Sequence, residues 1–113
     1  MSCEHLGIGE WASGNVYIRP MRRDAGGVVD GHTHNFDHTT IFFRGRWNVR
    51  ATLPDGRVIE RQFTAPSHAL IKAEVVHQLT ALDDGSEAWC VYAHRTPQGE
   101  VVQEFNGWGD AYL

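Results

Sequence analysis

The sequence predicts an all-β domain, either a barrel or a sandwich, from three observations. About eight short segments rich in β-branched and aromatic residues are separated by clusters of turn formers. The run from Trp47 to Leu53 alternates apolar and polar residues, as a half-buried strand does. No segment shows a sustained apolar period of about 3.6 residues with caps, the pattern of an amphipathic helix. Short strands joined by turns are typical of all-β folds.

Length and charge limit the organisation and the partners of the chain. With 113 residues, it is expected to form a single domain over residues 1–113 with one core. Apolar residues make up 42% and charged residues 21% of the chain, as in ordinary soluble globular proteins. The formal net charge of −4 speaks against nucleic-acid binding, which needs a basic surface. The charge therefore gives no indication of a nucleic-acid partner.

The compartment is inferred from apolar runs and cysteines. No apolar run approaches the roughly 18 residues of a membrane span. The N-terminal segment Met1–His5 lacks the basic and apolar parts of a signal peptide. Two cysteines, Cys3 and Cys90, are too few for a disulfide framework. We therefore expect a cytoplasmic protein with free thiols and no membrane partner, with a Cys3–Cys90 bridge as the alternative.

The expected strands lie between turn residues. Residues 1–13 are expected to be irregular because glycines interrupt them. The strand that begins at Val16 is expected to stop at Pro20. Pro54-Asp55-Gly56 is expected to form a hairpin turn between the Trp47–Leu53 strand and the next one. The other expected strands are 28–34, 39–44, 58–63, 69–71, 75–82, 88–94 and 101–105.

Three of the seven histidines form an H-x-H-x3-H pattern at His32, His34 and His38. If this segment is a strand, His32 and His34 point to one face, because side chains alternate along a strand. After a turn, His38 opens the next strand, and His77 on a distant strand can supply a fourth imidazole. Imidazoles facing an apolar interior need a metal ion or a hydrogen bond. Spacing leaves both alternatives open.

The same residues carry a resemblance to a known family. The run Gly31–His38, followed by Gly45, resembles the first motif of the cupin superfamily: H-x-H, three or four residues, a Glu, six residues and a Gly. His38 stands in the place of that Glu, and Gly45 falls in register. The segment Lys72–His77 resembles the second motif, whose ligand is the histidine. The second motif has Pro, Gly and Asn at the positions of Lys72, Glu74 and Ala81.

The cupin resemblance covers about residues 15–95 and leaves extensions at both ends. It implies a double-stranded β-helix, which is the jelly roll or cupin barrel, and commonly a homodimer. The exchange of Glu for His resembles the four-histidine variant of some small single-domain bacterial cupins, including manganese-binding ones. It implies one divalent transition metal, either Mn, Fe, Ni or Zn, with four ligands: His32, His34, His38 and His77.

This ligand set suggests oxygen chemistry. Four neutral imidazoles leave the ion its full charge, and an octahedral ion would keep two positions open for water, dioxygen or a chelating ligand. We therefore expect a small metal-dependent oxygenase, a dioxygenase-like oxidoreductase, that acts on an oxygen-chelating molecule such as a dicarbonyl or a phenolic. The alternatives are a metal-dependent isomerase or lyase, a non-catalytic barrel that binds or senses a small ligand, and a structural zinc site. No catalytic residue is assigned.

Apolar side chains near the histidines are interpreted from strand alternation. Thr40 and Phe42 share a face with His38 and either line the cavity or belong to the core. Cys90 is not expected to be a nucleophile, because no base can be assigned beside it. Trp89, Cys90 and Tyr92 lie on a strand that the cupin resemblance places near the barrel mouth or wall, and core packing is favoured for them over contact with a substrate.

Charged and polar residues of the same region have two interpretations each. Arg44 and Arg46 flank Gly45 and either bind an anion or end their strands in solvent. Glu74 is either a general acid or base or an exposed carboxylate. We expect His5 and His68 at the surface. An exposed strand end is the favoured position for His94, with a role beside the cavity as the alternative.

Overall fold

The computed structural model describes residues 4–7, 10–13, 15–93 and 95–101, and all regular elements within these ranges are β-strands. No helix in these ranges is long and apolar enough to cross a membrane. The strands are β1 (Glu4–Gly7), β2 (Glu10–Ser13), β3 (Val16–Arg23), β4 (Val28–His32), β5 (His38–Arg44), β6 (Arg46–Thr52), β7 (Val58–Thr64), β8 (Ser67–Ile71), β9 (Val76–Ala81) and β10 (Ser86–Ala93).

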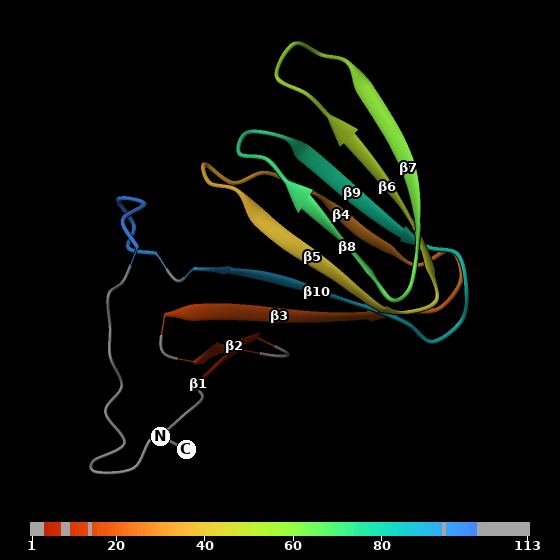
Figure 1. Cartoon of the computed structure of the whole chain (residues 1–113), viewed down its shortest axis with the longest axis horizontal. Coiled ribbons are helices and arrows are strands. Elements are labelled where there is room, and N and C mark those ends of the chain that lie inside the picture. Colours follow the sequence, from red (N-terminus) through yellow and green to blue (C-terminus); the bar gives the residue numbers. More distant parts are fainter. Residues whose placement is uncertain (1–3, 8–9, 14, 94, 102–113) are drawn as a thin grey trace.

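The strands form two antiparallel sheets (Figure 1). One sheet has the order β1-β2-β3-β10-β5-β8, and the other has the order β4-β9-β6-β7. In both sheets the central strands pair with strands distant in sequence, since β10 lies between β3 and β5 and β9 lies between β4 and β6. Strands that cross between two facing antiparallel sheets define a jelly roll. The predicted all-β double-stranded β-helix is therefore confirmed.

The core lies between the inward faces of the two sheets. Phe42 from β5 and Trp47 from β6 are fully buried, and each such side chain contributes about 2–3 kcal/mol. The Phe42 ring stacks on Phe63 with centroids 4.9 Å apart, so Phe42 is a core residue rather than a cavity-lining one. The buried apolar residues are Met21, Val29, Phe42, Trp47, Val49, Ala69, Ile71, Val75, Leu79, Ala81, Ala88 and Cys90.

Two expectations for the N-terminal part are wrong. Residues 4–7 and 10–13 form the paired strands β1 and β2, which extend the larger sheet, although glycines flank them. The strand that begins at Val16 does not stop at Pro20 but continues to Arg23. β2 pairs with β3 only as far as Ile18. Beyond Ile18 this edge of β3 pairs with no other strand of the described residues, and such an edge tolerates the missing N–H of proline.

The C-terminal expectation is met only in part. Arg95 and Val101 form an isolated antiparallel bridge after β10. The expected strand 101–105 therefore begins with a bridge, and residues 102–105 lie outside the described residues. His94 also lies outside them.

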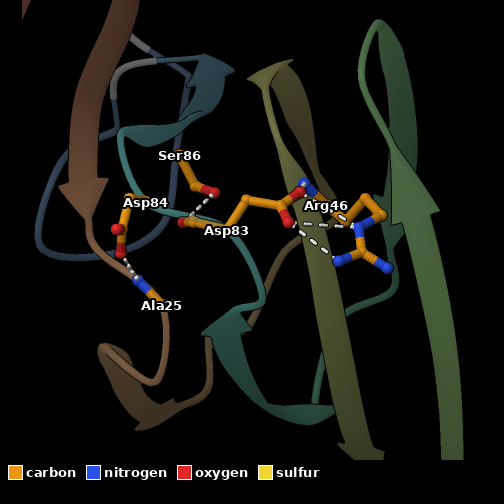
Figure 2. Close-up of polar contacts among 5 residues, drawn as sticks. All are labelled: Ala25, Arg46, Asp83, Asp84 and Ser86. Carbon is orange, nitrogen blue, oxygen red and sulfur yellow. Dashed lines mark hydrogen bonds and ion pairs between the residues drawn. The ribbon is translucent and has the colours of Figure 1, made fainter.

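The turn between β9 and β10 is tied to two neighbouring segments (Figure 2). The Asp83 carboxylate accepts hydrogen bonds from the backbone N–H of Arg46 at 2.9 Å and from its Nη2 at 2.8 Å. Asp84 accepts from the Ala25 N–H at 3.0 Å, and the Ser86 hydroxyl donates to the Asp83 carbonyl at 2.7 Å. The Arg46 hydrogen bonds hold the pKa of Asp83 below its ordinary 3.8. Arg46 is thus engaged in an ion pair within the chain.

Gly45 allows the tight turn between β5 and β6. Its φ of +75° lies in the left-handed region that favours glycine. A methyl group at this position would overlap the Ser86 hydroxyl and lie 3.1 Å from the Ser86 Cβ. Gly56 in the β6–β7 hairpin has a similar φ of +89°, but nothing lies within 4 Å of the position its Cβ would take. An alanine at Gly56 would therefore meet backbone strain alone, whereas an alanine at Gly45 would meet backbone strain and steric overlap.

We predict that Gly45→Ala destabilises the fold more than Gly56→Ala does. Gly56→Ala should cost about 1 kcal/mol of unfolding free energy, because only the backbone is strained. Gly45→Ala should cost at least about 1 kcal/mol more, because Ser86 must also move. Urea denaturation of the two variants measures this difference. Equal losses would contradict the role given to Ser86.

Candidate metal centre

Two buried histidines face each other from opposite sheets. His38 is the first residue of β5 in the larger sheet, and its side chain is 3% exposed. His77 lies on β9 in the smaller sheet and is fully buried. Both occupy inward positions of strands whose side chains alternate between core and solvent. A third histidine, His34, lies in the connection between β4 and β5 and is half-buried.

The three imidazole rings gather at one end of the core. The ring centroids of His34 and His38 are 5.0 Å apart, and those of His38 and His77 are 4.9 Å apart. The separation of the His34 and His77 centroids is 6.2 Å. Rings that share one ion at a metal–nitrogen distance of about 2.1 Å have centroids about 4.5–5.3 Å apart when they occupy tetrahedral or adjacent octahedral positions. Two of the three separations fall in that range and the His34–His77 separation exceeds it, so the three rings are neighbours that do not yet surround one point as placed.

A backbone hydrogen bond sets the orientation of His77. Its Nδ1 lies 3.0 Å from the Val75 carbonyl oxygen. A carbonyl can only accept, so Nδ1 carries the proton and the neutral ring keeps its lone pair on Nε2. This Nε2 is buried, as are both ring nitrogens of His38. Histidines that bind metals characteristically donate their other N–H in this way. The chemistry of these nitrogens fits a divalent transition metal.

The connection that carries His34 is fixed against the connection between β8 and β9. The Glu74 N–H donates to the His34 carbonyl at 2.8 Å. The Asp37 carboxylate accepts from the Ala73 N–H at 2.8 Å and from the Lys72 ammonium at 3.1 Å. The Ala73 bond, and then the Lys72 contact, lower the pKa of Asp37. These bonds place His34 close to the strand that carries His77.

The turn before β9 forms without the glycine of the cupin motif. Glu74 occupies that position and has a φ of +65°, in the left-handed region. A non-glycine residue there costs about 1 kcal/mol or more, and the hydrogen bond to His34 offsets part of that cost. The Glu74 side chain is exposed, which agrees with the expectation of a surface carboxylate.

One expectation for the histidine motif is wrong. β4 ends at His32, so His32 and His34 do not alternate along one strand. The His32 backbone pairs with His77 after a register shift that follows Val29, and the His32 side chain lies outside the described residues. Among the side chains that the structure describes, no three His, Cys, Asp or Glu groups could hold a metal ion by themselves. The set of four ligands therefore stays a prediction.

An aromatic wall of Tyr92 and Phe36 lies beside the cluster, whereas the sequence favours core packing for Tyr92 and indicates no role for Phe36. The Tyr92 ring centroid lies 5.5 Å from that of His34 and 6.1 Å from that of His38. Phe36 stacks on His34 at 4.9 Å and lies 4.8 Å from Tyr92. Alternation with Cys90 along β10 indicates that Tyr92 faces inward, but it does not show which residues it meets.

Arg95 lies against the Phe36 ring of this aromatic wall. Its guanidinium carbon is 4.5 Å from the Phe36 ring centroid. Its Nη1 donates to the Gly99 carbonyl at 3.2 Å. No motif pointed to Arg95, because its position depends on the path of the chain after β10.

The remaining candidates lie away from the cluster or outside the described side chains. His68 on β8 is exposed, as expected. The side chain of His5 lies outside the described residues. Cys90 is a buried free thiol, 3.9 Å from the Thr40 hydroxyl, and burial raises its pKa. A raised pKa disfavours the nucleophilic thiolate. The partner proposed for a bridge, Cys3, lies outside the described residues.

Comparisons with known proteins give structural neighbours only. No protein-family profile matches the chain, and no curated protein matches it. A variant of oxalate decarboxylase from Bacillus subtilis is 17% identical with a TM-score of 0.66, over 86% of this chain and 29% of that one. The oxalate decarboxylase–formate complex from Lactobacillus farciminis is 22% identical with a TM-score of 0.65, over 80% and 30% of the two chains.

A third neighbour is a Bacillus subtilis oxalate decarboxylase described with Mn(II) centres, 18% identical with a TM-score of 0.66 over 89% of this chain. The chain spans about three tenths of the length of these proteins. Oxalate decarboxylases are cupin-fold proteins, and at these identities the similarity establishes the fold. The chain thus has the jelly-roll fold of the cupins.

Proposed function

We propose that this chain is a metal-binding cupin that holds one divalent transition metal, either Mn, Fe, Ni or Zn, with His32, His34, His38 and His77 as ligands. The observation that carries the proposal is the orientation of His77. Its Nδ1 donates to a backbone carbonyl, and its buried Nε2 lies in a cluster with two other imidazoles. The Mn(II) centres of a structural neighbour support the same assignment.

We further propose that the centre acts on a small oxygen-chelating molecule as a metal-dependent oxygenase. When bound, the metal would supply Lewis-acid and redox chemistry to an oxygen ligand. Burial of His38 and His77 excludes water from the inner side of the centre. The half-buried His34 leaves a side from which a ligand approaches, and Phe36 and Tyr92 flank that side. Flat dicarbonyl or phenolic molecules suit such aromatic surroundings.

Two other functions of the same centre have specific support. Structural similarity to oxalate decarboxylases favours a metal-dependent lyase as the nearest alternative. A non-catalytic barrel that binds or senses a small ligand needs the same accessible side at His34. A structural zinc site is less favoured, because a closed site does not need an accessible ligand.

We predict that His34→Ala weakens divalent-metal binding at least ten-fold, because it removes one ligand from the partly accessible edge of the cluster. The matched control is His68→Ala, which removes an exposed histidine from β8 and should leave the affinity unchanged. Competition with a chromophoric chelator measures both affinities for Mn and Zn. Equal affinity in wild type and His34→Ala would contradict the ligand assignment, and absence of metal binding by the wild type would overturn the proposed function.

We predict that the metal-loaded protein consumes dioxygen with a β-dicarbonyl or a phenolic, and that His34→Ala abolishes this uptake. An oxygen electrode with a panel of both classes measures the uptake. Carbon dioxide released from oxalate would instead indicate the lyase. Ligand binding without turnover would replace the oxygenase with the binding or sensing function.

We also propose that the chain forms a homodimer through the outer face of the larger sheet. One cross-strand row on this face runs over five strands, from Trp11 through Ile18, Val91 and Thr39 to Leu70. Leu70 is 61% exposed and Trp11 is 40% exposed. At about 4.8 Å between strands, the row is about 19 Å wide. A second row contains Pro20, Trp89, Ile41 and His68.

The extent of this apolar face favours a second copy as its partner. The exposed ring of Phe43 packs on Trp89 at 4.6 Å and widens the face beyond the two rows. Monomeric proteins rarely expose contiguous apolar patches larger than a few hundred Å². A dimer of two such faces would bury about 800 Å² per copy with the polar rim included.

We predict that Leu70→Lys weakens this dimer at least ten-fold, because it places a charge in the apolar row. The matched control is Ile59→Lys on β7 of the other sheet, where Ile59 is 50% exposed. Light scattering after size-exclusion chromatography measures the mass at several concentrations. A monomeric wild type, or equal effects of the two variants, would exclude this interface.

A further inference from the structure

Arg95 is separated from the imidazole cluster by a single aromatic ring. Its guanidinium carbon lies 4.5 Å from the Phe36 centroid, and Phe36 stacks on His34 with centroids 4.9 Å apart. Tyr92, three residues earlier in the chain, contacts the same ring of Phe36 at 4.8 Å. Arg95 is therefore a positive charge at the edge of the proposed metal centre, in a chain whose formal net charge is −4.

The guanidinium of Arg95 is fixed, but one of its donors is unused. Nη1 donates to the Gly99 carbonyl at 3.2 Å, and Phe36 supports the guanidinium plane. Nε is buried and makes no hydrogen bond within the described part of the chain. A buried N–H without an acceptor is costly, so such a group needs an acceptor from elsewhere. The guanidinium edge that contains Nε and Nη2 has the geometry to donate two parallel hydrogen bonds to one carboxylate.

Asp37, a carboxylate on which the charge of Arg95 acts, is already engaged. The two carboxylate oxygens of Asp37 already accept hydrogen bonds from the Ala73 N–H and from the Lys72 ammonium, which lower its pKa, and the charge of Arg95 contributes to this lowering. Arg95 makes no ion pair with any acidic residue of the described ranges. An external anion is therefore the acceptor that suits its free edge.

We propose that Arg95 forms an anion subsite that selects ligands with a carboxylate beyond the metal-chelating group. The ligand class is a small organic acid that presents oxygen atoms to the metal at one end and a carboxylate to Arg95 at the other. This inference rests on the proposed metal centre, because the centre holds the first end of the ligand. It narrows the substrate class from any oxygen chelator to anionic ones, since a neutral dicarbonyl would leave the Arg95 edge unsatisfied.

The test compares dicarboxylates with a monocarboxylate on the metal-loaded protein. Isothermal titration with malonate, succinate, glutarate and acetate gives the affinity of each probe. We expect at least one dicarboxylate to bind the wild type at least ten-fold more tightly than acetate does. Arg95→Gln should reduce this preference to less than about three-fold, because the loss of one bidentate charged contact accounts for about ten-fold or more.

Two control variants separate the subsite from general effects. Arg61 lies 5.0 Å from the centroid of Phe63, so Arg61→Gln removes an equivalent cation–π pair from a strand outside the cluster and should keep the preference. Arg95→Lys keeps the charge but loses the planar fork, and should lose most of the preference. Thermal unfolding of each variant reports whether the fold is retained.

The outcomes distinguish this inference from the proposed function. Competition with a chelator on the same samples measures the affinity of the protein for the metal. Arg95→Gln should leave this affinity unchanged. Failure of the wild type to bind metal overturns the proposed function and this inference with it. Metal binding without a dicarboxylate preference, or with a preference that survives in Arg95→Gln, overturns the anion subsite alone.

Discussion

The hydrogen bond from the Glu74 N–H to the His34 carbonyl joins the two connections that build the candidate metal centre. One connection carries His34, and the other leads into β9, which carries His77. The two strands that hold His38 and His77 belong to different sheets, so their separation is set by the packed core. His34 has no strand to hold it and depends on this bond and on Asp37. The strain at Glu74 is therefore located where the two halves of the centre meet.

The two buried imidazoles, His38 and His77, lie in direct continuity with the apolar core. His77 and Leu79 are both fully buried on β9, so the apolar core continues directly into the cluster. An apolar environment stabilises neutral imidazole, because burial disfavours the charged ring. Neutral rings are the form that binds metals. The packing that stabilises the fold thus also builds the apolar surroundings of these two rings.

The sequence was sufficient for the fold and for part of the site. Alternation from Trp47 to Leu53 and the hairpin at Gly56 depend on local chemistry, and both were predicted. β1, β2 and the passage through Pro20 were missed, because strand pairing overrides local breakers. The position of Tyr92 beside the histidines was only the less favoured alternative, and Arg95 was missed, for a related reason. Their contacts with Phe36 arise from the arrangement of β10 and the 33–37 connection, which no local pattern encodes.

The proposed ligand set and the proposed anion subsite come from different segments. The four histidines lie at the end of β4, in the β4–β5 connection, at the start of β5 and on β9, whereas Tyr92 and Arg95 lie on β10 and on the segment that follows it. The Gly99 carbonyl that holds Arg95 belongs to that same segment. Changes in residues 95–101 can therefore alter the charge facing a ligand while the hydrogen bonds of His77 and Asp37 stay in place. Such a separation would let the proposed metal centre take different acids through changes in a single loop.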